Sequence, residues 1–248
     1  MSVLLAKNWA GSDPTGWWIS EKLDGVRAVW DCRTLTTRNG QAIHAPQWFI
    51  DSMPKAEPLD GELWIGRGQF QRTVGVVRSR SAGDDWKAIR FAAFDAPMAL
   101  GGFEERMAAM QDAVTDGAAF VLPQRRCEGQ ADLLEELCCV EQAGGEGVML
   151  REPGSRYERK RSGTLLKVKT FHDAEATVIG YEAGTGRNAC AVGALVAQLQ
   201  DGTEFRVSSG LTDAVRRNPP AVGSLFTFKY QEMTDGGVPR FPSFLRVA

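Results

Sequence analysis

Apolar and polar residues along the first 170 positions form short segments of two kinds, separated by Gly, Pro, Asn and Asp. Short runs that alternate or stay apolar between such turn residues predict strands. We expect strands at residues 17–22, 26–32, 34–37, 59–65, 89–94, 120–122, 146–150 and 164–169. Apolar residues at helical spacing, ended by Pro or Gly, predict helices. We expect helices at residues 46–53, 69–77, 103–114 and 131–143.

The pattern changes after about residue 170, where helices nearly vanish and strands follow one another at hairpin spacing. We expect strands at 174–182, 191–200, 204–207 and 225–233, and one helix at 212–218. Short strands with a single small helix are typical of a Greek-key barrel of the OB type. We therefore expect an α+β fold in two domains. Residues 1–171 would carry antiparallel sheets with helices, and residues 172–248 a small all-β OB domain.

Lys22 stands between two apolar runs, directly before an Asp-Gly pair. The stretch from Trp17 to Trp30 predicts a strand that ends at Lys22, turns at residues 24–25 and resumes at Val26. A lysine amine at a strand end can attack phosphorus once its pKa is lowered. The alternative is an ordinary surface hairpin, and this stretch alone does not decide between the two.

Composition narrows the class of protein. The 248 residues are 43% hydrophobic and 24% charged, as in a soluble globular protein. No apolar run approaches the roughly 20 residues of a membrane span, so we expect no membrane partner. The polar N-terminus shows no secretory signal, so a cytoplasmic location is expected, with a periplasmic one as the alternative if a signal peptide has been removed.

Cysteine and histidine usage argues against several kinds of site. Five cysteines without a C-x-x-C pair fit neither a disulfide framework nor a zinc site. Only two histidines are present, which argues against histidine-based metal or triad chemistry. Cys138 and Cys139 fall in the predicted helix 131–143 and are expected to fill its core side.

Positive charge is concentrated in two segments of a chain whose net charge is −2. Residues 151–170 carry a local net charge of +5, and residues 67–90 one of +4. Two basic segments in a mildly acidic chain predict a localised anion-binding face. The alternative for either segment is a solvated charged surface.

Seven charged side chains fall at predicted strand ends or mouths: Lys22, Arg27, Arg38, Glu62, Glu146, Lys167 and Lys169. One nucleophilic lysine, two carboxylates and several cations suit nucleotidyl transfer, in which charge develops on phosphate oxygens. The strand period of two places Lys167 and Lys169 on one face, directed either to solvent or into a polyphosphate site. Phe94 at a strand end can either stack on a purine or pack in the core.

Motifs spread over the chain resemble those of the covalent nucleotidyltransferases, which comprise ATP-dependent DNA ligases, RNA ligases and capping enzymes. The matching segments, in order, are Lys22-Leu23-Asp24-Gly25-Val26-Arg27, Thr37-Arg38-Asn39-Gly40, Asp60-Gly61-Glu62, Phe91-Ala92-Ala93-Phe94-Asp95, Glu146-Gly147-Val148-Met149, Leu165-Leu166-Lys167-Val168-Lys169 and Pro239-Arg240-Phe241-Pro242-Ser243-Phe244-Leu245-Arg246. Among these families the chain is most similar to minimal bacterial ATP-dependent DNA ligases. The resemblance implies a nucleotidyltransferase (adenylation) domain followed by the OB domain.

The resemblance implies a reaction through covalent intermediates. Lys22 would attack the α-phosphate of ATP to give lysyl-AMP, and AMP would pass to the 5′-phosphate of a nick before the strand is sealed. Glu62 and Glu146 would be ligands of Mg²⁺, with Mn²⁺ as a substitute, because hard cations prefer oxygen ligands.

Further residues would hold ATP. Phe94 would stack on adenine, Glu62 would contact the ribose, and Arg27 would contact the ribose and phosphate. Lys167 and Lys169 would hold the α-phosphate. Arg240 on the OB domain would reach the leaving pyrophosphate.

The expected partner is nicked double-stranded DNA, bound by a monomer. Arg38 would read the nick 5′-phosphate, and Arg78, Arg80 and Arg161 would contribute to the grip on DNA. An RNA ligase is the alternative within the same chemistry. A binding module that has lost catalysis is the alternative of a different class, against which Lys22, Glu62 and Glu146 argue together.

Overall fold

The computed structural model describes residues 2–79, 83–115, 117–234 and 236–248. The predicted DNA contact Arg80 therefore lies outside the described residues. The chain divides into two compact units, Met1–Lys169 and Thr170–Ala248. Within the described ranges, no helix combines the length and the apolar character that a membrane span requires.

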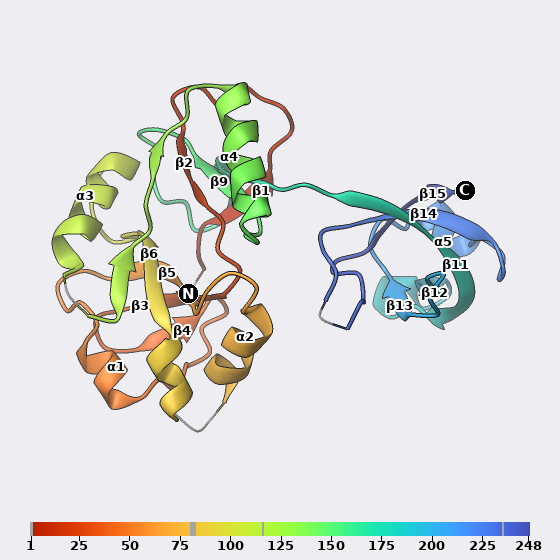
Figure 1. The fold of residues 1–248 in the computed structure, drawn as a ribbon, viewed down its shortest axis with the longest axis horizontal. Coiled ribbons are helices and arrows are strands. Elements are labelled where there is room, and N and C mark those ends of the chain that lie inside the picture. The colour runs from red at the N-terminus through yellow and green to blue at the C-terminus, as the bar shows by residue number, and fades with distance from the viewer. Residues whose placement is uncertain (1, 80–82, 116, 235) are drawn as a thin grey trace. The chain divides into compact units, whose positions relative to one another are not determined.

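The first sheet of the first unit has the strand order β1, β10, β9, β2, β8. Its strands are β1 (Leu5–Asn8), β10 (Arg161–Val168), β9 (Val148–Arg151), β2 (Trp18–Glu21) and β8 (Arg125–Arg126). All neighbours are antiparallel except β1 and β10, which run parallel. One face of this sheet is covered by α4 (Gln130–Gln142) (Figure 1). The buried contacts there are Ile19, Leu133, Leu137, Val140, Val148, Leu150, Leu166 and Val168.

The second sheet has the order β4, β3, β5, β6, β7. Its strands are β4 (Leu35–Thr37), β3 (Val26–Trp30), β5 (Leu59–Trp64), β6 (Arg90–Asp95) and β7 (Ala119–Val121). The helices α1 (Gln47–Asp51), α2 (Phe70–Arg78) and α3 (Phe103–Ala113) and the short η1 (Asp84–Ala88) belong to this half of the unit (Figure 1). Its core is aromatic-rich, with Trp30, Phe49, Trp86 and Phe91 fully buried.

β2 and β3 lie in different sheets, so the stretch around Lys22 is not a hairpin. β2 pairs with β9 and β8, while β3 pairs with β4 and β5. Residues 22–25 therefore cross from one sheet to the other. The surface-hairpin alternative is wrong because each strand finds its hydrogen-bonding partners elsewhere.

The second unit is one antiparallel sheet in the order β13, β12, β11, β14, β15. Its strands are β11 (His172–Ala183), β12 (Val192–Gln198), β13 (Glu204–Val207), β14 (Leu225–Tyr230) and β15 (Ser243–Val247), with the short η2 (Gly186–Asn188). The helix α5 (Asp213–Arg217) is capped by Thr212, whose hydroxyl accepts from Val215 N at 3.3 Å. Phenylalanines dominate its core, at positions 205, 226, 228 and 244.

Two expectations differ from the observed fold. Cys138 and Cys139 are exposed, because α4 buries Leu133, Leu137 and Val140 and turns the two cysteines outward. The strands β1, β8 and β15 were not predicted from the pattern. β8 is only Arg125–Arg126, two exposed charged residues that carry no apolar signal.

Candidate active site

Lys22 lies where the chain passes between the two sheets. Its backbone N–H donates to the carbonyl of Gly147 at 2.8 Å, which ties the lysine to the segment just before β9. Gly147 has a φ of +144°, and a Cβ there would lie 2.5 Å from the Val168 carbonyl. Glycine is therefore required at this junction.

Glu146 joins two of the predicted lysines. Its Oε2 accepts from Lys22 Nζ and its Oε1 accepts from Lys169 Nζ. The side chains are 8% exposed for Glu146, 7% for Lys169 and 24% for Lys22. A carboxylate this buried needs paired charges, so the structure brings the predicted nucleophile, metal ligand and phosphate-binding lysine together.

Glu62 lies against the segment that follows Lys22. A Cβ on Gly25 would be 2.9 Å from Glu62 Cγ and 2.3 Å from the Leu63 carbonyl, so this close approach also requires glycine. Burial raises the pKa of Glu62 to about 7, although the nearby charges of Lys22 and Arg27 pull it down. Glu62 is thus a second carboxylate within electrostatic reach of Lys22.

Arg27 is held beside Phe94. Its Nε and Nη2 donate to Asp60 at 2.9 and 2.5 Å, a two-bond pair with a fully buried carboxylate. The guanidinium carbon lies 5.2 Å from the centre of the Phe94 ring. Phe94 also packs against the small apolar cluster of Leu23, Ala92 and Leu122. Phe94 is therefore a partly buried wall of the site.

Lys167 faces the same region from the first sheet. The register pairs Lys167 with Met149, and Met149 with Ser20, two residues before Lys22. Side chains directly opposite one another share a face of the sheet. Burial lowers the pKa of Lys167, and the positive charges of Lys22 and Arg161 lower it further. This places Lys167 within electrostatic reach of both Lys22 and Arg161.

Three other predicted residues of the first unit are exposed. Arg38 is exposed on the turn after β4, and Arg78 is exposed at the end of α2. Arg161 is exposed and its Nη1 donates to the Ala6 carbonyl. In the second unit, Arg240 forms an ion pair with Glu232.

Part of the predicted basic face is buried or paired with acidic side chains. Arg151 is 5% exposed and pairs at 3.1 Å with the fully buried Asp95. Asp95 also binds Arg106, at 2.7 Å. Arg67 makes two hydrogen bonds to Glu21, at 2.8 and 2.9 Å. The net charge of a sequence segment therefore overstates its free positive surface, because the acidic partners of its arginines lie elsewhere in the sequence.

The carboxylates fit a magnesium ion that is completed by substrate. No cluster of three or more His, Cys, Asp or Glu able to hold a metal occurs among the described residues. Glu62 and Glu146 both lie near Lys22. Mg²⁺ is often held by only one or two carboxylates together with substrate phosphates, so this donor set suits it.

Four residues of the site region were not identified from the sequence in the roles that the structure gives them. Asp60 was identified only as part of the Asp60-Gly61-Glu62 motif, although an aspartate in an apolar strand indicates a buried charge with a partner. Tyr157, whose hydroxyl donates to Asp60 at 2.5 Å, and the Glu21–Arg67 pair gave no local signal. Their contacts join residues 97 and 46 positions apart.

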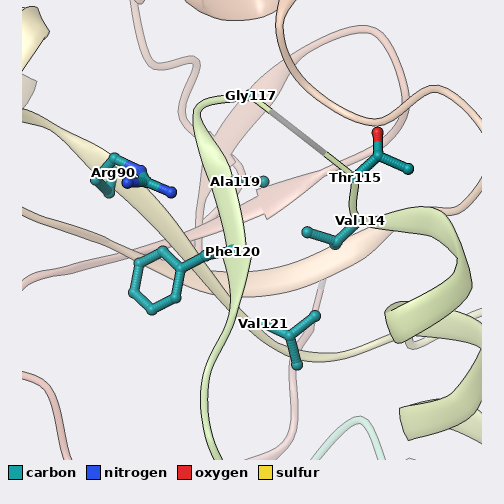
Figure 2. Close-up of a pocket in the computed structure, with 7 residues that line it drawn as sticks. All are labelled: Arg90, Val114, Thr115, Gly117, Ala119, Phe120 and Val121. Carbon is teal, nitrogen blue, oxygen red and sulfur yellow. The ribbon is translucent and has the colours of Figure 1, made fainter.

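A cavity of about 530 Å³ lies around β7, apart from these residues. It is lined by Arg90, Val114, Thr115, Gly117, Ala119, Phe120 and Val121 (Figure 2). The guanidinium carbon of Arg90 lies 5.3 Å from the Phe120 ring centre. Its lining shares no residue with the group around Lys22, so we assign the chemistry to that group and not to this cavity.

Comparisons with known proteins identify the family of this chain. A family model described as a DNA ligase OB-like domain matches residues 183–247. The chain is 38% identical over 247 residues to a DNA ligase of Haemophilus influenzae, covering 98% of this chain and 91% of that protein. A solved structure from a study of Lig E DNA ligases, on DNA binding with a minimal scaffold, matches with a TM-score of 0.94. Its identity is 40%, over 100% of this chain and 99% of that one.

A Chlorella virus DNA ligase-adenylate structure matches with a TM-score of 0.58 and 26% identity, over 100% of this chain and 98% of that one. The expected α+β fold, with a nucleotidyltransferase-type ligase domain and an OB domain, is confirmed. With this identity over nearly its whole length, the chain belongs to the DNA ligase family.

Proposed function

We propose that the protein is an ATP-dependent ligase that seals nicks with 5′-phosphate and 3′-hydroxyl ends in duplex DNA. The observation that carries the proposal is the amine of Lys22 bound to Glu146, with Lys169 on the other oxygen of the same carboxylate. A surface lysine has no need of such surroundings. A lysine that attacks phosphorus needs charged groups around it, because the amine loses positive charge and the phosphate oxygens gain negative charge during attack.

In the first step the Lys22 amine, having lost a proton, attacks the α-phosphorus of ATP. A P–N bond forms while the bond from α-phosphorus to the bridging oxygen breaks, and pyrophosphate leaves with the electron pair. The attacking nitrogen then releases a second proton to solvent, which leaves a neutral phosphoramidate nitrogen. Lys167 and Lys169 offset negative charge on the α-phosphate oxygens. Phe94 and Arg27 hold the nucleoside end.

In the second step an oxygen of the nick 5′-phosphate attacks the same phosphorus, and the P–N bond breaks as the Lys22 nitrogen takes up a proton and leaves as the amine. In the third step the 3′-hydroxyl attacks the 5′-phosphate, loses its proton and displaces AMP. Arg38, Arg78, Arg80 and Arg161 are proposed to contact DNA phosphates, and Arg240 the pyrophosphate. A monomer acting on nicked duplex is proposed.

Glu62 and Glu146 are proposed to hold Mg²⁺. When bound, the ion would polarise phosphate oxygens and neutralise charge that develops on them. Lys22 and Lys169 both pair with Glu146, so the proposed metal ligand also binds two amines.

Sealing of a labelled nicked duplex, with ATP or NAD⁺ and Mg²⁺, tests the proposal. We expect joined product with ATP only, and none from Lys22→Ala. Activity with NAD⁺ alone, or none with either nucleotide, would contradict it. Nicked RNA in the same assay separates the RNA-ligase alternative, since preferential sealing of RNA would favour it.

Binding to nicked DNA tests the proposed grip separately. Contact with about five phosphates implies roughly a 500-fold loss of affinity between 50 and 200 mM salt. Charge reversal of the exposed Arg78 should weaken binding at low salt and flatten this dependence. Salt-independent binding would contradict a phosphate-dominated interface.

A further inference from the structure

Asp60 is a fully buried carboxylate in β5 that accepts three hydrogen bonds from side chains. Two of these bonds come from Arg27 and the third from the hydroxyl of Tyr157. A buried charge of this kind stays ionised only when donors surround it. Each donor therefore affects where the carboxylate sits, and through it where Arg27 sits.

Tyr157 reaches Asp60 from a different part of the chain. It belongs to the loop between β9 and β10. Its hydroxyl donates to Asp60 Oδ2 at 2.5 Å and accepts from the backbone N–H of Leu4 at 3.3 Å. Burial raises the pKa of Tyr157, and the charge of Asp60 raises it further. The tyrosine hydroxyl is thus protonated at neutral pH and donates a hydrogen bond.

Arg27, at the other end of this hydrogen-bonded chain, lies at the proposed nucleotide site. Arg27 uses its Nε and Nη2 on Asp60 and places its guanidinium carbon 5.2 Å from the Phe94 ring centre. The arginine side chain is 18% exposed, whereas that of Asp60 is 0%. Arg27 is therefore the member that meets a ligand, and Tyr157 and Asp60 fix its guanidinium plane from behind.

We propose that Tyr157 is a positioning residue for ATP: acting through Asp60, it fixes the guanidinium of Arg27 beside Phe94. This inference rests on the proposed function, in which Arg27 and Phe94 hold the nucleoside. It places a binding determinant in the loop 152–160, which the sequence suggested only as part of a basic face.

The test is the rate of self-adenylation of the full chain, measured without DNA over a range of ATP concentrations. Tyr157→Phe removes one hydroxyl and keeps the ring. We expect the KM for ATP to rise about three- to tenfold, the loss expected for one hydrogen bond to a charged group, with kcat within about twofold. An unchanged KM, or a fall in kcat alone, would overturn the inference.

Tyr181→Phe is the matched control. It deletes a hydroxyl that donates to the Pro220 carbonyl at 2.6 Å in the second unit, and it should leave both constants unchanged. Tyr157→Phe must also act through Arg27. In an Arg27→Ala background, Tyr157→Phe should therefore raise the KM for ATP little further. If the two substitutions instead raise KM independently, so that their fold-increases multiply, Tyr157 has a general structural role.

Folding and function are separated within the same experiment. All seven tryptophans lie in the first unit, so their fluorescence reports whether that unit stays folded. If Tyr157→Phe does not fold, Asp60→Asn, which keeps the shape and weakens the same bonds, should raise KM, and an unchanged KM there would overturn the inference. If the wild type takes up no AMP from ATP, the proposed function itself fails; if it does and Tyr157→Phe matches it, only this inference fails.

Discussion

Glu146 and Lys22 form an ion pair at the junction of the two sheets of the first unit, and the carboxylate is only 8% exposed. Because Lys169 binds its other oxygen, Glu146 sets the position of two amines. Glu146→Gln would keep the shape and remove the charge. We expect self-adenylation to fall by about 100-fold or more, as for loss of a group that stabilises charge in a transition state.

Glu135→Gln is the control for this change. Glu135 is exposed on α4, so the same substitution there should leave adenylation unaffected. A Glu146→Gln variant with wild-type adenylation would show that the ion pair with Lys22 has no part in the chemistry.

The raised pKa of Glu62 should make the unfolding free energy depend on pH. Burial raises its pKa from 4.5 to about 7, so the folded chain keeps this proton where the unfolded chain has released it. The contribution of Glu62 to the unfolding free energy therefore falls as pH rises from about 4.5 to about 7, and it stays constant above pH 7. Glu62→Gln cannot ionise, and its stability relative to wild type should improve by ~2 kcal/mol between pH 5 and pH 8.

Urea unfolding followed by tryptophan fluorescence measures this difference, because all seven tryptophans lie in the first unit. Comparing the variant with wild type at each pH cancels the groups that titrate in both. The same stability difference at pH 5 and pH 8 would show that the Glu62 proton is not linked to folding.

Arg67 and Glu21 form a two-bond pair that joins the residue before Lys22 to the segment after β5. Their side chains are 38% and 20% exposed, so the pair is worth less than about 1 kcal/mol. We expect Arg67→Gln and Glu21→Gln each to slow adenylation about threefold, and the double variant to be no slower than the worse single one.

Arg72→Gln is the comparison for Arg67, since Arg72 on α2 lies 4.0 Å from its nearest carboxylate, Asp85. It should adenylate normally. If Arg67→Gln adenylates normally and instead loses affinity for DNA, Arg67 is a phosphate contact, as its place in the basic segment suggested.

Asp95 compensates two buried arginines, Arg106 and Arg151, which are 1% and 5% exposed. Asp95→Asn would leave both without their counter-charge. We expect a loss of about 3–5 kcal/mol in the unfolding free energy of the first unit. Asp84→Asn, at a pair whose side chains are 69% and 91% exposed, should change nothing measurable, and equal effects of the two variants would contradict the argument.

Much of the fold follows from local pattern. The strand Glu204–Val207 and the helices at residues 70–78, 103–113 and 130–142 match their predicted positions to within a residue or so. These segments have clear apolar periodicity, and their turns carry Gly or Pro. The segment from Lys22 to Gly25 shows the limit. Its flanking strands were predicted, but their membership of different sheets depends on pairing distant in sequence.

The site, like the fold, was predictable only in part. Lys22, Glu146 and Lys169 were identified from motifs, and the structure brings them into contact. Asp60 and Tyr157 were not, because a hydrogen bond across 97 positions leaves no local trace. Charge counting placed Arg151 on a basic face, whereas burial and Asp95 put it inside.

The central claim is that Lys22 carries AMP. The most direct measurement is to incubate the protein with ATP and Mg²⁺, digest it, and map the AMP-bearing peptide by mass spectrometry. We expect AMP on Lys22, absent from Lys22→Ala and present in Lys167→Ala at reduced yield. AMP on another residue, or undiminished labelling of Lys22→Ala, would contradict it.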